Sequence, residues 1–257
     1  MGDDMCNIAV VGTSYVGLLT SIGLAHLGHY VICIDDQGNR VNQLRNGHLP
    51  YDNQELYKRM EEAVSSGRLT FITNYAWGVR NVDIIFIAVE PVKEMETATG
   101  NAPFQHVLTQ VASHIKQDVT IINRSSFPIG SYEGMKQIVH NHISSQYKVD
   151  FVYNPALIEG GGAVSSIAHG DHVIVGCEKK ETLFVMESLY RRLKRPLLHT
   201  NVASAEMIQY IWDTFYNRKS TSMTKITTMC TELHANVKDV EAAMASLHPP
   251  VYLPYYM

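Results

Sequence analysis

Residues 7–35 read NIAVVGTSYVGLLTSIGLAHLGHYVICID, which predicts a strand, a glycine turn, a helix and a second strand. Ile8–Val11 is short, apolar and β-branched, as a buried parallel strand should be. Gly12 permits a tight turn after this strand, and Gly17 lets the following helix pack close to it. Val31–Ile34 then forms the second strand. This order of elements is that of a Rossmann βαβ unit.

The second strand ends in an acid, Asp35, which lies 18 residues after Gly17. That spacing is close to the roughly 20 residues expected for the acid that binds the ribose hydroxyls of a dinucleotide. An acid favours NAD, because the 2′-phosphate of NADP would be repelled. The N-terminus of the intervening helix offers N–H groups and a positive dipole end to a pyrophosphate. We therefore expect NAD to contact Gly12, Ser14, Tyr15, Val16, Gly17, Asp35, Arg40, Val89, Glu90, Ser125 and Ser126.

One position departs from the G-x-G-x-x-G pattern, because Ser14 stands where the middle glycine is usual. At this position the backbone comes closest to the pyrophosphate. Serine is small enough to fit, and its hydroxyl could bond a phosphate. The alternative is a Rossmann unit that keeps the fold but has lost cofactor affinity.

Length and composition place the chain among globular proteins. It has 257 residues, 46% hydrophobic and 18% charged, and a net charge of −4. This negative net charge does not indicate nucleic acid or an anionic membrane as a partner. No apolar run is long enough to span a bilayer, and the acidic start MGDDMC does not resemble a secretory signal. The four cysteines form no C-x-x-C pair, so we expect buried, reduced thiols and a cytoplasmic location.

Strand and helix patterns alternate as far as about residue 198. The expected further strands are 69–72, 83–89, 119–123, 149–153 and 173–175, and the expected helices are 39–46, 53–65, 104–115, 129–142 and 179–193. Strands separated by helices predict an α/β fold, a doubly wound parallel sheet with helices on both faces. Ser125 and Ser126 then follow a strand at its carboxyl end, where such sheets bind ligands.

The pattern changes after residue 200. Residues 203–233 contain neither proline nor glycine and carry an apolar stripe made of Met207, Ile211, Phe215, Met223, Ile226 and Cys230. We predict one long helix here, a short helix at 237–245 and a tail rich in proline and tyrosine, so that 1–200 is the Rossmann-type domain and 201–257 a dimerisation region. Since an apolar stripe must be buried, a homodimer through 203–233 is expected. The alternative is a helix that folds back onto its own sheet.

Several motifs in order along the chain resemble those of the UDP-glucose/GDP-mannose 6-dehydrogenase family. They are GTSYVG at 12–17, NG at 46–47, GRL at 67–69, IIFIAVEP at 84–91, NRSSFPIGS at 123–131, NPALIEGGGA at 154–163, SAEM at 204–207 and NVKDV at 236–240. The family writes the first as GTGYVG and the fifth as NKSTVPVGT. The resemblance implies NAD as cofactor and oxidation of a sugar C6 alcohol to a carboxylate, in two hydride transfers. It also implies a cysteine nucleophile, a lysine and an asparagine that steady the oxyanion, and a glutamate that assists hydrolysis.

The sequence departs from the family where that chemistry is done. Ala156 and Gly160 replace two glutamates, Gln209 replaces the lysine, and Asp213 and Thr224 replace two asparagines. The cysteine motif expected after Ala245 does not occur, and the nucleotide-sugar-binding domain is absent from the sequence. Removal of one oxyanion donor costs about 10²–10³ in rate, and loss of the nucleophile costs more. The resemblance therefore implies a truncated, catalytically degenerate member.

Three functions remain open. The first is an NAD-binding, dimeric protein without C6 oxidation of its own. The second is an NAD-dependent oxidoreductase that transfers one hydride on a different sugar or small alcohol, with Asp213 or Glu159 as weak candidates for the base. The third is a half-enzyme that a partner chain completes, with a nucleotide sugar as a possible ligand. His169 and His172 lack a third ligand nearby, so no metal site is expected.

Overall fold

The computed structural model describes residues 5–90, 102–157, 172–218 and 223–246, without the side chains of 215–218 and 223–225. Its strands form one eight-stranded sheet in the order β3-β2-β1-β4-β5-β6-β7-β8. Their bounds are β1 Asn7–Val11, β2 Tyr30–Ile34, β3 Leu69–Ile72, β4 Ile84–Ile87, β5 Val119–Asn123, β6 Val149–Tyr153, β7 Val173–Cys177 and β8 Leu197–Thr200. The chain starts in the middle of the sheet and winds outward both ways, as predicted for a doubly wound fold.

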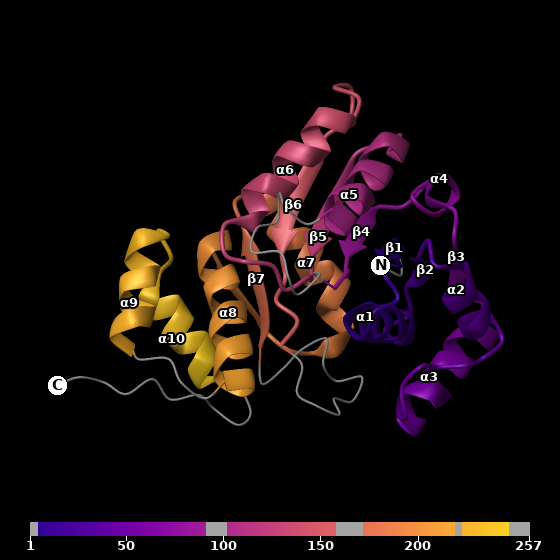
Figure 1. Ribbon diagram of the computed structural model, residues 1–257, viewed down its shortest axis with the longest axis horizontal. Coiled ribbons are helices and arrows are strands. Elements are labelled where there is room, and N and C mark those ends of the chain that lie inside the picture. The colour runs from indigo at the N-terminus through magenta and orange to yellow at the C-terminus, as the bar shows by residue number, and fades with distance from the viewer. Residues whose placement is uncertain (1–4, 91–101, 158–171, 219–222, 247–257) are drawn as a thin grey trace.

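Helices cover both faces of the sheet (Figure 1). They are α1 Tyr15–His26, α2 Gly38–Arg45, α3 Gln54–Ser65, α4 Tyr75–Gly78, α5 Ala102–His114, α6 Ser131–His142, α7 Lys180–Tyr190, α8 Val202–Arg218, α9 Met223–Glu232 and α10 Val237–Ala245. The side chains of β1 alternate between two cores. Ile8 and Val10 pack with α1, α2, α3 and α7, whereas Ala9 and Val11 pack with the remaining helices. This two-residue alternation is the strand geometry that the sequence predicts.

The sheet is mostly parallel, as predicted, and its last two strands are the exception. β7 pairs antiparallel with β6, and β8 pairs parallel with β7, so both run against the other strands. A parallel return needs a crossover, usually a helix. The sequence between β6 and β7 contains three consecutive glycines and no periodic apolar pattern that would favour such a helix. Sequence patterns also missed β8, which has only two apolar residues, and α4, which is a single turn and too short to show a helical period.

The predicted single helix over 203–233 is replaced by two helices, α8 and α9, which lie beside each other (Figure 1). Ile208 and Ile211 of α8 pack on the sheet, and Ile226 and Cys230 of α9 belong to the same core. The stripe residues whose side chains are described are therefore buried within the chain by two shorter helices, as in the alternative of a helix laid back on its own sheet. The side chains of Phe215 and Met223 lie outside the described residues.

The cysteines are free thiols: Cys33, Cys177 and Cys230 are buried, and Cys6 is half-buried. Burial raises the pKa of Cys33 to about 12 and that of Cys177 to about 11. These two thiols therefore stay protonated at neutral pH and are inert, as expected of structural cysteines. No helix within the described ranges is long and apolar enough to cross a membrane.

Candidate functional site

The turn between β1 and α1 is packed so tightly that two of its residues must be glycine. Gly12 has φ +110°, and a Cβ there would lie 2.4 Å from the carbonyl oxygen of Ala88. A Cβ on Gly17 would lie 2.1 Å from the carbonyl oxygen of Gly12. Real Cβ atoms do not approach backbone oxygens this closely, so both glycines are steric requirements, as the sequence predicts.

Ser14 is accommodated because its backbone, at φ −59°, does not need glycine. Its hydroxyl donates to the carbonyl oxygen of Ala88 at 2.9 Å and accepts from the backbone N–H of Gly17 at 3.2 Å. The side chain thus caps the N-terminus of α1 and joins the turn to the end of β4. The hydroxyl proton that the sequence suggested for a phosphate is used within the protein.

Asp35 lies at the carboxyl end of β2 and faces the same turn. One carboxylate oxygen accepts from the backbone N–H of Thr13 at 2.8 Å and from its hydroxyl at 2.6 Å. The other accepts from the backbone N–H of Gln37 at 2.9 Å. The carboxylate is 9% exposed and held in one orientation beside the glycine turn.

These residues surround a cleft of about 490 Å³, within the range of small-molecule sites. Six of the predicted cofactor residues line it, namely Gly12, Ser14, Asp35, Arg40, Val89 and Glu90. The other five, Tyr15, Val16, Gly17, Ser125 and Ser126, are not among its described lining residues. The cleft therefore joins the carboxyl ends of β1, β2 and β4 with the N-terminus of α1, where a doubly wound sheet binds its ligand.

Sequence reasoning missed several residues of the cleft. They are Thr13, Asp36, Gln37, Tyr75, Ala102, Pro103, His106 and Val107. Thr13 and Asp36 are neighbours of the motif residues, so their position in the sequence could have indicated them. Tyr75 and His106 come from α4 and α5, and no local pattern points to the cleft. His106 Nε2 lies 3.9 Å from a carboxylate oxygen of Asp36, and both side chains are exposed.

Ser125 follows β5 but does not reach the cleft. Its hydroxyl donates to the carbonyl oxygen of Ile87 at 3.2 Å and accepts from the backbone N–H of Val89 at 3.0 Å. The side chain is 2% exposed and connects the ends of β4 and β5. Both bonds of this hydroxyl are to backbone, so it has a structural role, and its contact with the cofactor stays a prediction.

Ser126 points instead toward α8, where it meets Asp213 and, through it, Gln209 and Ala156. Its hydroxyl donates to one oxygen of Asp213 at 2.8 Å, and the Gln209 amide donates to the other at 3.0 Å. The Gln209 side-chain oxygen accepts from the backbone N–H of Ala156 at 2.7 Å. Burial raises the pKa of Asp213, while the two hydrogen bonds lower it. Asp213 is thus a half-buried carboxyl group that accepts hydrogen bonds from two side chains.

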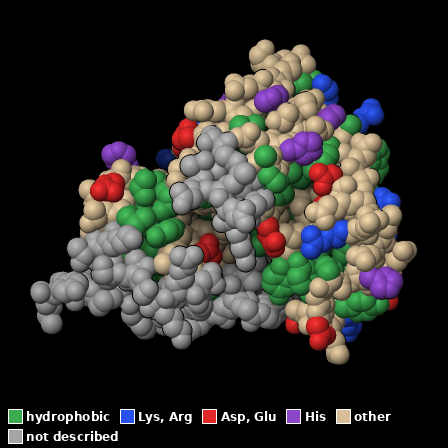
Figure 2. Space-filling model, in the orientation of Figure 1, with side chains coloured by type: hydrophobic (Ala, Val, Ile, Leu, Met, Phe, Trp, Pro, Cys, Tyr) green, Lys and Arg blue, Asp and Glu red, His purple; other side chains and the backbone are tan. Residues whose placement is uncertain are grey.

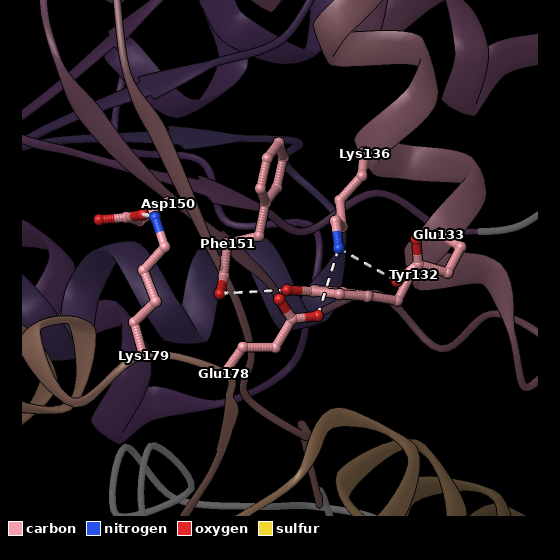
Figure 3. A network of polar contacts seen from close by, with 7 residues as sticks. All are labelled: Tyr132, Glu133, Lys136, Asp150, Phe151, Glu178 and Lys179. Atoms are coloured by element: carbon pink, nitrogen blue, oxygen red, sulfur yellow. Dashed lines mark hydrogen bonds and ion pairs between the residues drawn. The ribbon is translucent and has the colours of Figure 1, made fainter. Parts of the chain in front are cut away.

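A second group of charged residues, drawn in Figure 3, lies away from the cleft, where α6 meets β6 and β7. Lys136 Nζ lies 3.1 Å from Glu133 and 3.2 Å from Glu178, and Lys179 pairs with Asp150. These pairs are solvent-exposed, so each adds little to stability. Among the described residues no three His, Cys, Asp or Glu side chains are grouped to hold a metal ion. Glu159, the other weak candidate for a base, lies outside the described residues.

Comparisons with known proteins identify the domain that contains this cleft. Residues 6–194 match the NAD binding domain of the UDP-glucose/GDP-mannose dehydrogenase family. The UDP-glucose 6-dehydrogenase YwqF of Bacillus subtilis is 30% identical over 238 residues, which cover 93% of this chain and 54% of that protein. A UDP-glucose 6-dehydrogenase of Rickettsia prowazekii is 30% identical, and the match covers 91% of this chain and 54% of that protein.

Solved structures give the same result. A UDP-glucose dehydrogenase from Pyrobaculum islandicum matches with a TM-score of 0.76 and 25% identity, over 83% of this chain and 50% of that one. The chain spans about half the length of these relatives. Because the matched domain is the family's NAD-binding domain and contains the glycine turn, Asp35 and the cleft, NAD is the cofactor that belongs to it. The chain belongs to the UDP-glucose/GDP-mannose dehydrogenase family.

Proposed function

We propose that this chain binds NAD in the cleft beside the β1–α1 turn and does not by itself oxidise a sugar C6 alcohol to a carboxylate. The proposal that the chain binds NAD rests on the carboxylate of Asp35. Thr13 and Gln37 hold this carboxylate by hydrogen bonds, and it lines the cleft together with the glycine turn. A negative charge at this position favours ribose hydroxyls over a 2′-phosphate.

The residues present fit such a cofactor. Ser14, the N-cap residue of α1, lines the cleft, so the positive dipole end of this helix faces it. Asp35 would hold the adenosine ribose, with Arg40 beside it. The carboxyl ends of β4 and β5 would receive the nicotinamide. When bound, NAD accepts a hydride from an alcohol carbon.

The second half of the proposal rests on α8. The family resemblance implies a lysine and an asparagine where this chain has Gln209 and Asp213. Gln209 carries no positive charge, and its amide is held by Ala156 and Asp213. An ionised Asp213 would repel the alkoxide that a hydride transfer generates, because like charges interact strongly in a water-poor site.

A second function is favoured by the same carboxyl group. Asp213 accepts a hydrogen bond from Ser126 at the carboxyl end of β5, and burial raises its pKa toward the range of a general base. Removal of one hydride from an alcohol needs only a base and the cofactor. Under this alternative the chain is a dehydrogenase of a smaller alcohol or another sugar.

The proposal includes partners. The described apolar residues of α8 and α9 are already buried or partly buried within the chain, so a homodimer here would use the other faces of these helices. The alternative is a second polypeptide that supplies the remainder of a dehydrogenase. Buried free thiols fit a reducing cytoplasm. Light scattering on a size-exclusion column tests the dimer, and a mass equal to one chain would remove that part of the proposal.

The binding claim is tested by titration with NADH, NAD and NADP, followed by thermal shift and nicotinamide fluorescence. We expect NAD to raise the melting temperature more than NADP does. Asp35→Asn should reduce that difference, whereas Asp52→Asn, an exposed acid outside the described lining of the cleft, should leave it unchanged. No shift with millimolar NAD would contradict cofactor binding.

The absence of C6 oxidation is tested separately by incubation with NAD and a panel of nucleotide sugars, while absorbance of the reduced nicotinamide is followed. We expect no turnover. Formation of two NADH per sugar would contradict the proposal, and one NADH per substrate, lost in Asp213→Asn, would favour the second function.

A further inference from the structure

Glu90 is an exposed acid on the rim of the cleft, and the segment that leads to it is packed against the glycine turn. A Cβ on Gly12 would lie 2.4 Å from the Ala88 carbonyl oxygen and 3.2 Å from a methyl group of Val89. The Ser14 hydroxyl bonds the same Ala88 carbonyl at 2.9 Å. Two consecutive residues before Glu90 are therefore held against the turn that precedes α1.

The charge of Glu90 also acts on Tyr51, whose ring packs on the first residue of α1. The ring of Tyr15, which opens α1, packs edge-on against Tyr51 with 4.8 Å between centroids. Burial raises the pKa of Tyr51, Arg40 lowers it, and Glu90 and Tyr15 raise it further. The charges of Glu90 and Arg40 thus act on one ring beside the N-terminus of α1.

The charge of the cleft is negative overall. Its described lining contains the carboxylates of Asp35, Asp36 and Glu90, and Arg40 is the one lysine or arginine among them. His106 lies 3.9 Å from Asp36. In the space-filling view, acidic side chains border the hollow in the middle of the face (Figure 2). Asp35 is held by three hydrogen bonds and suits a ribose, but no such bond is recorded for Glu90 among the described residues.

We propose that Glu90 is a specificity residue that disfavours a pyrophosphate at the N-terminus of α1, so that the cleft binds the diphosphate of a dinucleotide less tightly than it would without this charge. The positive end of a helix dipole amounts to about half an elementary charge. A full negative charge on the same rim repels a group that carries about two negative charges and so opposes that attraction. This inference rests on the proposed NAD site.

Isothermal titration of adenosine and of ADP-ribose tests this, because both lack nicotinamide and only the second carries a pyrophosphate. Glu90→Gln keeps the shape and removes the charge, and Glu61→Gln on α3 is the matched exposed control. We expect Glu90→Gln to tighten ADP-ribose roughly threefold to tenfold at low salt and to leave adenosine within about twofold. The gain should shrink at high salt, because exposed charges are screened.

Three other results of these titrations would contradict the proposed role of Glu90. Equal ADP-ribose affinity in the wild type and Glu90→Gln would remove the role of Glu90 while leaving the NAD site in place. A parallel gain for adenosine and ADP-ribose would show an effect unrelated to phosphate. Failure of both ligands to bind any variant would contradict the proposed function itself, and with it this inference.

Discussion

Asp35 accepts two hydrogen bonds from Thr13, one from the backbone nitrogen at 2.8 Å and one from the hydroxyl at 2.6 Å. The acid at the end of β2 is thereby joined to the turn after β1, and the two sides of the cleft form one unit. Both residues are buried, so the bonds are protected from water. Hydrogen bonds to a charged group contribute about 1.5–3 kcal/mol each, more than neutral ones.

Thr13→Val should therefore lower the free energy of unfolding by about 1–3 kcal/mol, because it leaves a buried carboxylate oxygen with one donor fewer. It should also weaken NADH binding, since Asp35 loses part of its support. Thr13→Ser keeps the hydroxyl and should lose less than half as much stability. Urea unfolding at pH 7 measures the stability of both variants. Equal stability of Thr13→Val and the wild type would contradict this role of Thr13.

Gly17→Ala should destabilise the protein by at least about 2 kcal/mol, because its Cβ would lie 2.1 Å from the carbonyl oxygen of Gly12 and backbone must move. Gly38→Ala at the start of α2 is the control, since its Cβ would meet nothing within 4 Å. Alanine favours helices over glycine, so this control should be neutral or slightly stabilising. Thermal unfolding of the pair checks the difference.

The buried His29 should make the protein less stable in mild acid. Its Nδ1 accepts from the Cys6 backbone N–H at 3.3 Å, and its Nε2 donates to the Leu189 carbonyl oxygen at 2.9 Å. Burial lowers the pKa of His29, the bond to Leu189 raises it and Arg192 lowers it, with a net decrease from 6.5. The unfolded chain then binds the proton more readily, so stability falls as pH drops through about 6.5, at up to about 1.4 kcal/mol per pH unit.

His29→Asn removes this titration and should flatten the dependence of unfolding free energy on pH between 5 and 7. His48→Asn, at an exposed histidine, should retain the wild-type slope. Denaturation at several pH values gives both slopes, and identical slopes in all three proteins would exclude His29 as the source.

Asp213 should have the opposite effect on the pH dependence of the unfolding free energy. Its pKa is raised by burial, so its stabilising contribution is full below the ordinary value of 3.8 and is lost as pH rises through the raised value. Asp213→Asn removes the charge and should be at least as stable as the wild type at pH 7–8, with a gap that closes toward pH 4. A variant that is less stable at pH 8 and equal at pH 4 would show that the ionised carboxylate is the stabilising form.

The sequence predicts those parts of the fold that depend on interactions between residues close together in the chain. The glycine turn, the βαβ unit and β3, β5 and β6 follow from short-range periodicity, and the structure confirms them. The reversal of β7 depends on pairing with β6, between segments far apart in sequence. The division of 203–233 into α8 and α9 depends on a shared core that no local pattern describes.

The same distinction holds for the cleft. The sequence by itself determined that Gly12 and Gly17 close a turn and that an acid stands at the end of β2, because steric limits and strand length act over a few residues. Only the tertiary structure decided which partner each polar group takes: Ser14 bonds Ala88, Ser125 bonds Ile87, and Ser126 bonds Asp213. A hydroxyl has one proton, and the nearest acceptor in space, rather than in sequence, receives it.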